Sequence, residues 1–250
     1  MSASLRTTAP DRPTRVLMVV ANPTTSPVTG WPVGFWWSEL THPWWVFAEA
    51  GYEVVVGSPA GGPVEADGFS DPEHESGYSG DDVLSLGFKR SPRHAVLLED
   101  TPRLGDLDLD QFDAMFFVGG QAPMTSYRGN EALQRFVADC LERGRVTALV
   151  CHATCLLLEA RDARGRLLVD GRSWTGFADA EERVADEFVG QRIQPFWIEE
   201  EARKIEGTNF MVDQPFRSFA VRDGLLVTGQ QQHSGAAAAR LVVELLGRAP

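Results

Sequence analysis

The sequence predicts an α/β fold in which helices cover both faces of a mostly parallel central sheet. Short apolar runs rich in β-branched and aromatic residues recur along the chain, and each ends in Gly, Pro or a polar turn. Strands that are buried on both faces have this pattern. Segments with the period of an amphipathic helix lie between the runs, and such alternation is typical of parallel sheets. With 250 residues, of which 43 % are hydrophobic and 23 % charged, the chain can bury one large core.

Four apolar runs predict the strands of the sheet. They are RVLMVVAN, YEVVVGSP, DAMFFVGG and TALVCH, at residues 15–22, 52–59, 113–120 and 147–152. Two helices are expected between them. The first, in GFWWSELTHPWWVFAEA, ends before Gly51. The second, at residues 130–144, places an apolar set on one face: Leu133, Phe136, Val137, Cys140 and Leu141.

The C-terminal third is expected to add shorter elements. SWTGF at residues 173–177 is strand-like, and FWIEEEARKI at residues 196–205 is helix-like. AVRDGLLVTG predicts a hairpin that turns at Asp223 and Gly224. The chain then closes with the helix SGAAAARLVVELLG, for which Ser234 is the expected N-cap.

We expect one domain over residues 15–250, preceded by a flexible Ser/Thr/Pro-rich leader at residues 1–14. Residues 60–110 interrupt the alternation of strands and helices, because GGPVEADGFSDPEHESGYSGDD is rich in Gly, Pro, Ser and acid. The segment is too long for a simple connection and too acidic for the core. We interpret it as a surface excursion that carries a short helix near residues 92–98.

Composition and charge exclude several classes of protein. The formal net charge is −12, and Lys occurs only at Lys89 and Lys204, so no nucleic-acid partner is expected. No apolar run approaches the roughly 18 residues that span a bilayer, so no membrane partner is expected. The first residues lack the apolar stretch of a secretory signal, and three cysteines do not suit a disulfide framework. We therefore predict a cytoplasmic protein with free thiols.

The stretch TALVCHATCLLLEA is the most informative local feature. A buried strand leads into Cys151 and His152 and then directly into a helix-forming segment. A thiol in such a strand-turn-helix lies at the N-terminus of a helix, where the partial positive charge favours the thiolate. The arrangement is the cysteine counterpart of the nucleophile elbow. The alternative is that Cys151 is a small buried core residue, as free cysteines often are.

Five blocks of sequence, taken in order, carry a family resemblance. They are GFWWSELTHPWWVFAEAGYEVVVGSPAGG, FDAMFFVGG, ALVCHATCLLL, SWTGFADAEE and GLLVTGQQQHSG. Together they resemble the ThiJ/PfpI superfamily within the class I glutamine amidotransferase-like fold, specifically its branch of glyoxalase III-like heat-shock chaperone homologues. The resemblance extends from Arg15 to the last helix. It implies a flavodoxin-like sandwich, a homodimer and a nucleophile elbow at Cys151.

The resemblance also implies roles for individual residues. Cys151 would be the nucleophile, His152 its acid/base partner, and Glu39 the carboxyl group beside the thiol. The alternative for Glu39 is a solvated position on its helix. An acidic residue of the SWTGFADAEE block would orient the histidine. Its position is Glu182, with the adjacent Glu181 and a solvated charge cluster as the alternatives.

A developing oxyanion would need N–H donors at the elbow. The resemblance places one on the backbone of His152 and another at Gly120 or Gln121. Better-known members carry Gly-His-Gly where this chain has Gly120, Gln121 and Ala122. That exchange keeps a backbone donor but removes an imidazole. Ala153 replaces the usual Gly after the Cys-His pair and is expected to narrow the approach to the thiol.

Tryptophan is concentrated around Glu39, where five of the seven Trp residues lie. One interpretation is that these side chains fill the core and a dimer interface. The other is that Trp36 and Trp37 line a pocket. A pocket of that kind would favour a substrate larger and more aromatic than a two- or three-carbon aldehyde.

No metal or organic cofactor is expected. His42, His74 and His94 have no ligand spacing with one another or with the cysteines, and no Gly-rich phosphate loop follows a strand. Cys140 fits the apolar face of its helix and is expected in the core. Cys155, four residues after the expected nucleophile, is expected to pack in the core, with a role as a resolving thiol as the alternative.

The elbow at Cys151 and the family resemblance together favour a cysteine-dependent, cofactor-independent enzyme, and the resemblance implies that it acts on a small carbonyl compound. The resemblance names this activity as glyoxalase III-type hydration of a 2-oxoaldehyde to a hydroxy acid, or related lyase or hydratase chemistry. One alternative is a tailoring enzyme for a larger aromatic specialised metabolite. Another is a stress chaperone without turnover, whose cysteine senses oxidation.

Overall fold

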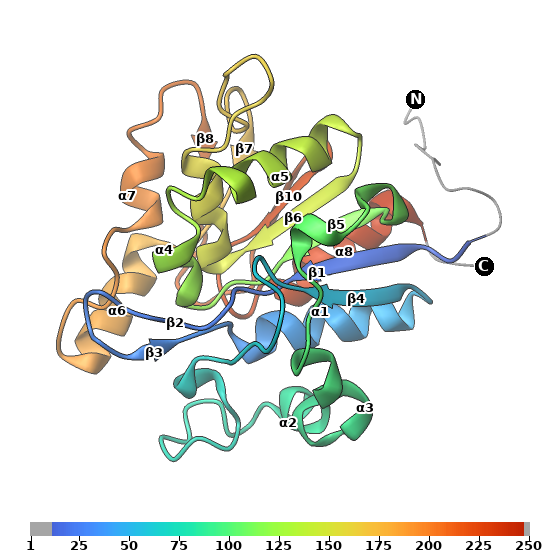
Figure 1. Cartoon of the computed structure of the whole chain (residues 1–250). Coiled ribbons are helices and arrows are strands. Elements are labelled where there is room, and N and C mark those ends of the chain that lie inside the picture. Colours follow the sequence, from blue (N-terminus) through green and yellow to red (C-terminus); the bar gives the residue numbers. More distant parts are fainter. Residues whose placement is uncertain (1–11, 248–250) are drawn as a thin grey trace.

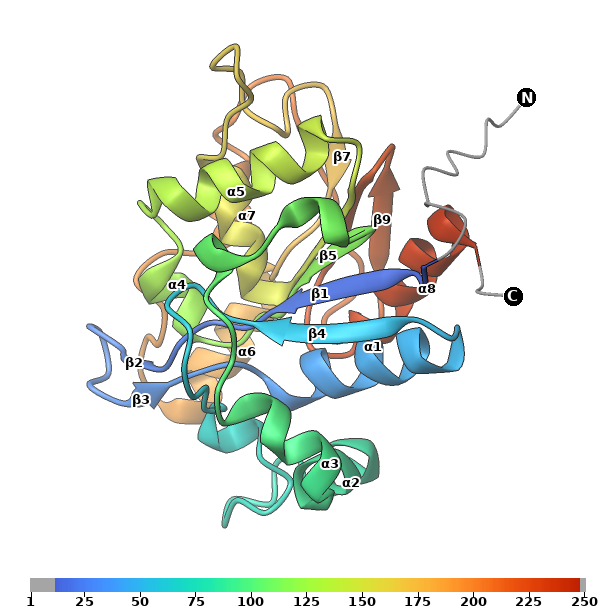
Figure 2. The ribbon, with the colours of Figure 1, turned by 45° about the vertical axis from the view of Figure 1, so that its right-hand side comes forward.

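A computed structural model describes residues 12–247, and Figures 1 and 2 show its ribbon. Within these residues, six strands form the central sheet in the order β4-β1-β5-β6-β10-β9. Neighbouring strands are parallel except for β10 and β9. The strands are β1 (Arg15–Val19), β4 (Glu53–Gly57), β5 (Ala114–Phe117), β6 (Val146–Val150), β9 (Ala220–Asp223) and β10 (Leu226–Gly229). The four predicted parallel strands and the hairpin are confirmed, although the hairpin turns one residue later, at Gly224 and Leu225.

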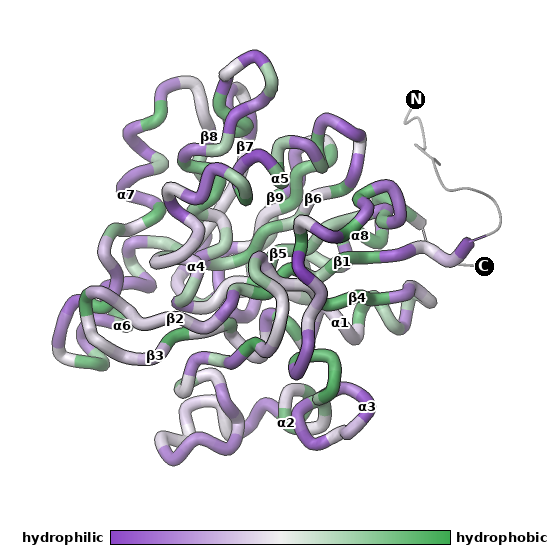
Figure 3. Tube along the Cα trace, in the orientation of Figure 1, coloured by the Kyte–Doolittle hydropathy of each residue, from purple (hydrophilic) through white to green (hydrophobic). Residues whose placement is uncertain are grey.

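Helices cover both faces of the sheet, as predicted (Figures 1 and 2). On one face α1 (Trp37–Glu49) packs against α8 (Gly235–Leu246), and α8 also contacts β6 and β10. On the other face α5 (Glu131–Glu142) packs on β6. The flavodoxin-like sandwich is therefore the fold of the described chain. Figure 3 shows the hydrophobic residues concentrated along the central strands.

The ends of two helices show how local sequence fixes their bounds. The side chain of Asn130 caps α5 by accepting a hydrogen bond from the backbone N–H of Leu133 at 3.1 Å. Ser234 precedes α8, as expected, but its side chain does not cap the helix. Its Oγ instead accepts from the backbone N–H groups of Phe219 and Gln231. The serine therefore ties the loop after β10 to the segment before β9.

Residues 60–110 contain more structure than the sequence predicted. The short helix expected near residues 92–98 is present as α3 (Pro92–Ala95) followed by the 3-10 helix η2 (Val96–Leu98). An additional helix, α2 (Val83–Arg90), was not predicted. The segment is also not confined to the surface. Phe88 and Asp67 are only 0 % and 1 % exposed, because Phe88 packs on the aromatic side chains of α1 and Asp67 reaches the loops beside the sheet. Shorter 3-10 turns in the segment are η1 (Gly68–Ser70), η3 (Leu104–Asp106) and η4 (Leu109–Gln111).

The remaining elements lie around the ends of the strands. The strand expected in SWTGF is limited to β7 (Ser173–Trp174), which pairs with β8 (Asn209–Phe210), and the helix expected at 196–205 is α7 (Ile198–Ala202). Two helices, α4 (Ala122–Ser126) and α6 (Asp179–Val189), were not predicted, and β2 (Thr24–Thr25) pairs with β3 (Pro32–Val33). Among residues 12–247 no helix is long and apolar enough to cross a membrane.

The segment after β6 differs from the expected α-helix. It is the 3-10 helix η5 (Cys151–Leu158), which is buried along its whole length. The hydroxyl of Thr154 donates to the carbonyl oxygen of Cys151 at 2.6 Å. Such a bond between a side chain and the backbone competes for a carbonyl that an α-helix would use in its own ladder. The turn at Cys151 is therefore followed by a 3-10 helix, which is tighter than the α-helix that the sequence predicts.

Candidate active site

The turn at Cys151 has the backbone conformation of a nucleophile elbow. Cys151 follows β6 directly and has a φ of 54°, which is unusual for a residue with a side chain. Its side chain is buried but lines a pocket. The ends of β5, β6 and β10 meet at this edge of the parallel sheet, where α/β proteins commonly bind ligands. The sequence prediction of a thiol presented by a strand-turn-helix is therefore matched by the geometry.

Glu39, from the first turn of α1, is fully buried and faces the same pocket. Its Oε2 accepts a hydrogen bond from the backbone N–H of Gly119 at 2.9 Å. Its other oxygen, Oε1, is buried without a hydrogen-bond partner among the described residues. Burial raises the pKa of Glu39 to about 7, although its contact with the Cys151 thiol and the charge of His152 act in the opposite direction. The carboxyl group can therefore both accept and return a proton near neutral pH.

Gly119 shows how closely the thiol and the carboxyl group approach each other. A Cβ atom on this residue would lie 2.3 Å from Oε2 of Glu39 and 2.8 Å from Cβ of Cys151. Both distances are far below van der Waals contact. Only glycine leaves room for the two side chains to converge at this point.

The pKa of the Cys151 thiol is raised well above its ordinary value, which is opposite to the effect expected of a helix N-terminus. Burial is the main cause, and the charge and proximity of Glu39 add to it. The backbone N–H groups of His152 and Gly120 act against this rise because they favour the charged sulfur. The resting pair is therefore a thiol beside a carboxyl group.

The ring of His152 is held by partners other than the thiol. Its Nδ1 lies 3.1 Å from the carbonyl oxygen of Gly120, and its Nε2 lies 3.2 Å from Oε1 of Glu182. The ring of Phe177 packs against it, with centroids 4.3 Å apart. Burial opposes the charged form, but the hydrogen bond and charge of Glu182 outweigh burial and raise the pKa of His152. The imidazole is thus fixed in place with both nitrogens engaged.

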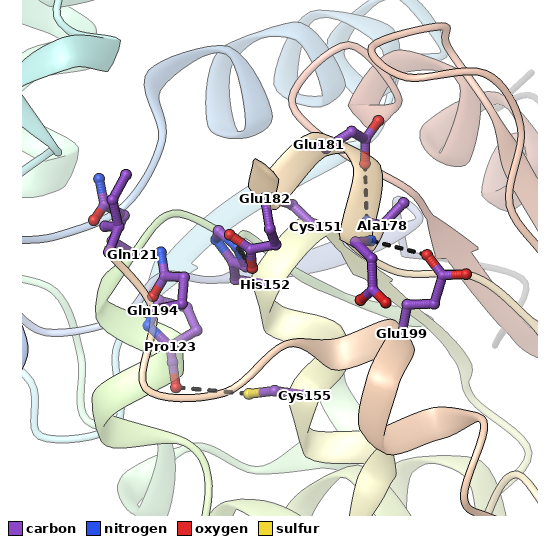
Figure 4. A network of polar contacts seen from close by, with 12 residues as sticks. Gln121, Pro123, Cys151, His152, Cys155, Ala178, Glu181, Glu182, Gln194 and Glu199 are labelled. Atoms are coloured by element: carbon purple, nitrogen blue, oxygen red, sulfur yellow. Dashed lines mark hydrogen bonds and ion pairs between the residues drawn. The ribbon is translucent and has the colours of Figure 1, made fainter. Parts of the chain in front are cut away.

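The two adjacent glutamates of α6 have different partners. Figure 4 shows Glu182 pointing toward His152, whereas Glu181 points away from it. The carboxylate of Glu181 accepts from the backbone N–H groups of Ala178 and Phe216 and from the side chain of Gln230. Of the two alternatives left open by the sequence, Glu182 is the residue placed against the histidine.

Asp67 is a buried residue of the site that sequence reasoning missed. It lies in the acidic segment 60–110, and its two carboxylate oxygens accept from the backbone N–H groups of Gly34 at 2.9 Å and Gln121 at 2.7 Å. Burial raises the pKa of Asp67 to about 7, although these two N–H groups act against the rise. Since Asp67 occupies the N–H of Gln121, the donor available to an oxyanion on this turn is the N–H of Gly120. Nothing in the local sequence distinguishes Asp67 from its solvated neighbours.

The pocket above Cys151 has a volume of about 160 Å³. Its lining includes the expected Glu39, Gln121, His152, Glu182 and Trp36, together with aromatic and aliphatic side chains of α6. Trp37 is absent from the lining. It packs instead against Phe35 and Phe88, with ring centroids 5.1 and 6.3 Å away. Neighbouring residues on a helix point about 100° apart, so Trp36 at the helix start faces the pocket while Trp37 faces the core.

The other cysteines are buried away from solvent. Cys140 is fully buried on α5, and burial raises its pKa to about 12. The thiol of Cys155 donates to the carbonyl oxygen of Pro123 at 3.6 Å, as drawn in Figure 4, and burial raises its pKa. Both positions agree with the prediction that these residues pack in the core. In the part of the chain that is described, no group of three His, Cys, Asp or Glu side chains could hold a metal ion.

Comparisons with known proteins agree with this fold. The profile of the DJ-1/PfpI family matches residues 33–245. Glyoxalase 3 of Candida albicans is 25 % identical over 207 residues, which cover 82 % of this chain and 86 % of that protein. Glutathione-independent glyoxalase HSP31 of Saccharomyces cerevisiae is 26 % identical over 197 residues, 76 % of this chain and 80 % of that protein. The crystal structure of glyoxalase III from Candida albicans superposes with a TM-score of 0.75 at 25 % identity, over 93 % of this chain and 97 % of that one.

Proposed function

This chain belongs to the DJ-1/PfpI family, and from that premise we propose that its pocket converts a 2-oxoaldehyde to a hydroxy acid without a cofactor. The relatives named as glyoxalases support this class of reaction. The observation that carries the proposal is the convergence of Cys151 and Glu39 on Gly119, inside a pocket. A thiol beside a carboxyl group with a pKa of about 7 is suited to add to a carbonyl and to move the protons that follow.

In the first step, the sulfur of Cys151 attacks the aldehyde carbon, and the thiol proton passes to the carboxylate of Glu39. A carbon–sulfur bond forms as the carbonyl π bond opens onto oxygen. Glu39 then passes its proton to that oxygen, which gives the hemithioacetal and restores the carboxylate. The backbone N–H groups of Gly120 and His152 act on the sulfur in the resting protein. We assign them to the oxygen of the hemithioacetal that forms beside it.

In the second step, the carboxylate of Glu39 removes the proton from the former aldehyde carbon and passes it to the ketone oxygen, which gives an enediol. The hydroxyl group on the sulfur-bearing carbon then loses its proton to Glu39, which delivers it to the neighbouring carbon. The product is the thioester of a 2-hydroxy acid, and the carboxylate is restored. The former aldehyde carbon is oxidised and the ketone carbon is reduced, so no external oxidant or reductant is consumed. Since the carboxyl group of Glu39 lines the pocket beside Cys151, it can contact both carbons of the bound substrate.

In the last step, water attacks the thioester, the carbon–sulfur bond breaks, and the hydroxy acid leaves with the thiol restored. The net change is the addition of one water molecule, which places the reaction with lyase or hydratase chemistry. We assign His152 to a fixed role, since both ring nitrogens already have partners. Glu182 is the positioning residue that holds the ring.

Replacement of Cys151 tests the proposal and separates it from the chaperone alternative. We expect Cys151→Ala to abolish turnover of methylglyoxal, measured as loss of the dicarbonyl and appearance of lactate. Cys155→Ala is the matched control, because that thiol is buried and bonded to Pro123, and this variant should retain turnover. Full turnover by Cys151→Ala would remove the nucleophile assignment. Protection of aggregating client proteins by an inactive Cys151→Ala variant would favour the chaperone.

The homodimer and the cytoplasmic location stay predictions from the family resemblance and from composition.

A further inference from the structure

The walls of the pocket are mainly aromatic, and they come from segments far apart in the sequence. Trp36 precedes α1, Phe188 lies on α6, and others come from the segment 60–110 and from the loops before α6 and β9. The aromatic lining residues are Trp36, Phe69, Tyr78, Phe177, Phe188 and Phe216. The expectation of an aromatic pocket therefore holds for Trp36, while most of the rings belong to residues that the sequence did not single out.

Four of these rings contact one another along the wall of the pocket. Phe188 lies 6.0 Å from Phe69 and 6.0 Å from Tyr78, measured between ring centroids. Trp36 contacts Tyr78 edge to face at 6.1 Å. Phe188 is 65 % exposed and Tyr78 is 50 % exposed, so these rings are not needed to fill the core. Exposed aromatic groups that rim a cavity are typical of a surface that receives an apolar ligand.

The charge of the lining excludes one kind of ligand. Among residues 12–247, no Lys or Arg side chain lines the pocket. The ionisable carboxyl groups of the lining are Glu39 and Glu182, and the imidazole of His152 is already bonded to Glu182. A carboxylate or phosphate on the substrate would find two acidic side chains nearby, and the one imidazole is already paired with Glu182. Three neutral amides complete the polar lining: Gln121, Gln194 and Gln232.

The size of the pocket limits the ligand further. Its volume is about 160 Å³. A protein cavity of about 150 Å³ lined by apolar side chains accommodates one benzene molecule. A three-carbon aldehyde would leave much of the aromatic wall in contact with water, whereas a single ring would cover it.

From these observations we propose that the substrate is an uncharged carbonyl compound that carries one aromatic ring. Its carbonyl group lies at Cys151, and its ring lies among Trp36, Tyr78 and Phe188. This inference rests on the proposed function, because it takes the thiol as the group that meets the carbonyl carbon. The three rings would select the substrate, and they would take no part in the chemical steps.

Turnover of two dicarbonyl substrates tests the inference. Phenylglyoxal should give a kcat/KM at least tenfold above that of methylglyoxal. Phe188→Ala should lower the value for phenylglyoxal by about two- to tenfold, the range of one aromatic contact, and change that for methylglyoxal by less than twofold. Phe188→Leu, which keeps apolar bulk without the ring, should restore only part of the loss. Val83→Ala is the control, since Val83 is 72 % exposed on α2 and outside the lining.

A preference for phenylglyoxal below twofold, or an equal effect of Phe188→Ala on both substrates, would overturn the inference.

A binding experiment with the Cys151→Ala variant keeps the failure of this inference distinguishable from the failure of the proposed function. If neither dicarbonyl is turned over by the unmodified protein, the proposed function fails. The inference then stands if acetophenone binds to Cys151→Ala, benzoate does not, and Phe188→Ala weakens acetophenone binding. It falls if acetophenone does not bind.

Discussion

The buried carboxyl groups of Glu39 and Asp67 hold the backbone on either side of Gly120. Glu39 accepts from the N–H of Gly119 at 2.9 Å, and Asp67 accepts from the N–H of Gln121 at 2.7 Å. Between them, Gly120 keeps its own N–H directed at the sulfur of Cys151 and its carbonyl oxygen at the ring of His152. The two acids therefore fix the turn that supplies both an N–H donor and the support of the histidine.

The first prediction concerns the pH dependence of turnover. Glu39 must be ionised to accept the thiol proton, and its pKa is about 7. We expect kcat/KM to rise with pH through about 7. Glu39→Gln should lower kcat/KM by about 10²- to 10⁴-fold, the usual contribution of a general base. The variant should also lose the acid limb of the pH profile, which is the rise of kcat/KM through about pH 7. Glu49→Gln, an exposed residue of the same helix, is the control. A Glu39→Gln variant that keeps the limb would contradict the assignment.

The second prediction concerns stability. The ordinary pKa of Glu39 is 4.5, and burial raises it to about 7, so the folded protein binds a proton in this window that the unfolded chain releases. The free energy of unfolding should therefore fall as pH rises from about 4 to about 8. Glu39→Gln should remove about 3 kcal/mol of this fall. Urea unfolding at both ends of the range measures it: the variant should match the parent at pH 4 and exceed it at pH 8. The same difference at both values would be inconsistent with a raised pKa.

The third prediction concerns Asp67 as a positioning residue. Asp67→Asn keeps the shape of the side chain but replaces an acceptor with an amide donor, so one of its two backbone N–H partners loses its acceptor. We expect kcat to fall about tenfold, the equivalent of one hydrogen bond. The charge of Asp67 also raises the pKa of Glu39. The acid limb of the pH profile should therefore move to lower pH.

Asp113→Asn serves as the control for Asp67→Asn. Asp113 is also buried, but it pairs with Arg12 and lies outside the pocket lining. That variant should leave the pH profile unchanged. A loss of activity in Asp67→Asn without any movement of the acid limb would show that Asp67 has only a structural role.

The fourth prediction uses one substitution at two glycines. Gly119→Ala would force a methyl group against Glu39 and Cys151, at 2.3 and 2.8 Å. We expect at least a 100-fold loss of kcat/KM and a loss of stability of about 1–3 kcal/mol. Gly87→Ala on α2 meets nothing within 4 Å and should stabilise the protein by about 0.5–1 kcal/mol, as expected within a helix. Thermal unfolding and turnover measure both. Full activity in Gly119→Ala would argue against the close approach of thiol and carboxyl group.

The regular part of the fold could be predicted because its signals are local. Strands such as β1 and β6 are continuous apolar runs, and α5 shows its buried face in the spacing of its apolar residues. The position of Glu182 also followed from the sequence, through the family resemblance. These features depend on residues that are close in the chain or in a recognisable block.

The rest depends on contacts between distant segments. Asp67 is buried because the N–H groups of Gly34 and Gln121 meet it, and its own neighbours in the chain give no sign of this. The raised pKa of the Cys151 thiol follows from burial and from the approach of Glu39, and a local view of a helix N-terminus includes neither. Nothing in the sequence singles out Phe188, which lines the pocket because α6 lies beside it.

The fixed ring of His152 has a consequence for chemical labelling. Diethyl pyrocarbonate acylates a histidine only where a ring nitrogen can offer a free electron pair to the reagent. In His152 one nitrogen faces the carbonyl oxygen of Gly120 and the other faces Glu182, whichever member of that pair holds the proton. Acylation should therefore pass over His152, although the residue lines the pocket.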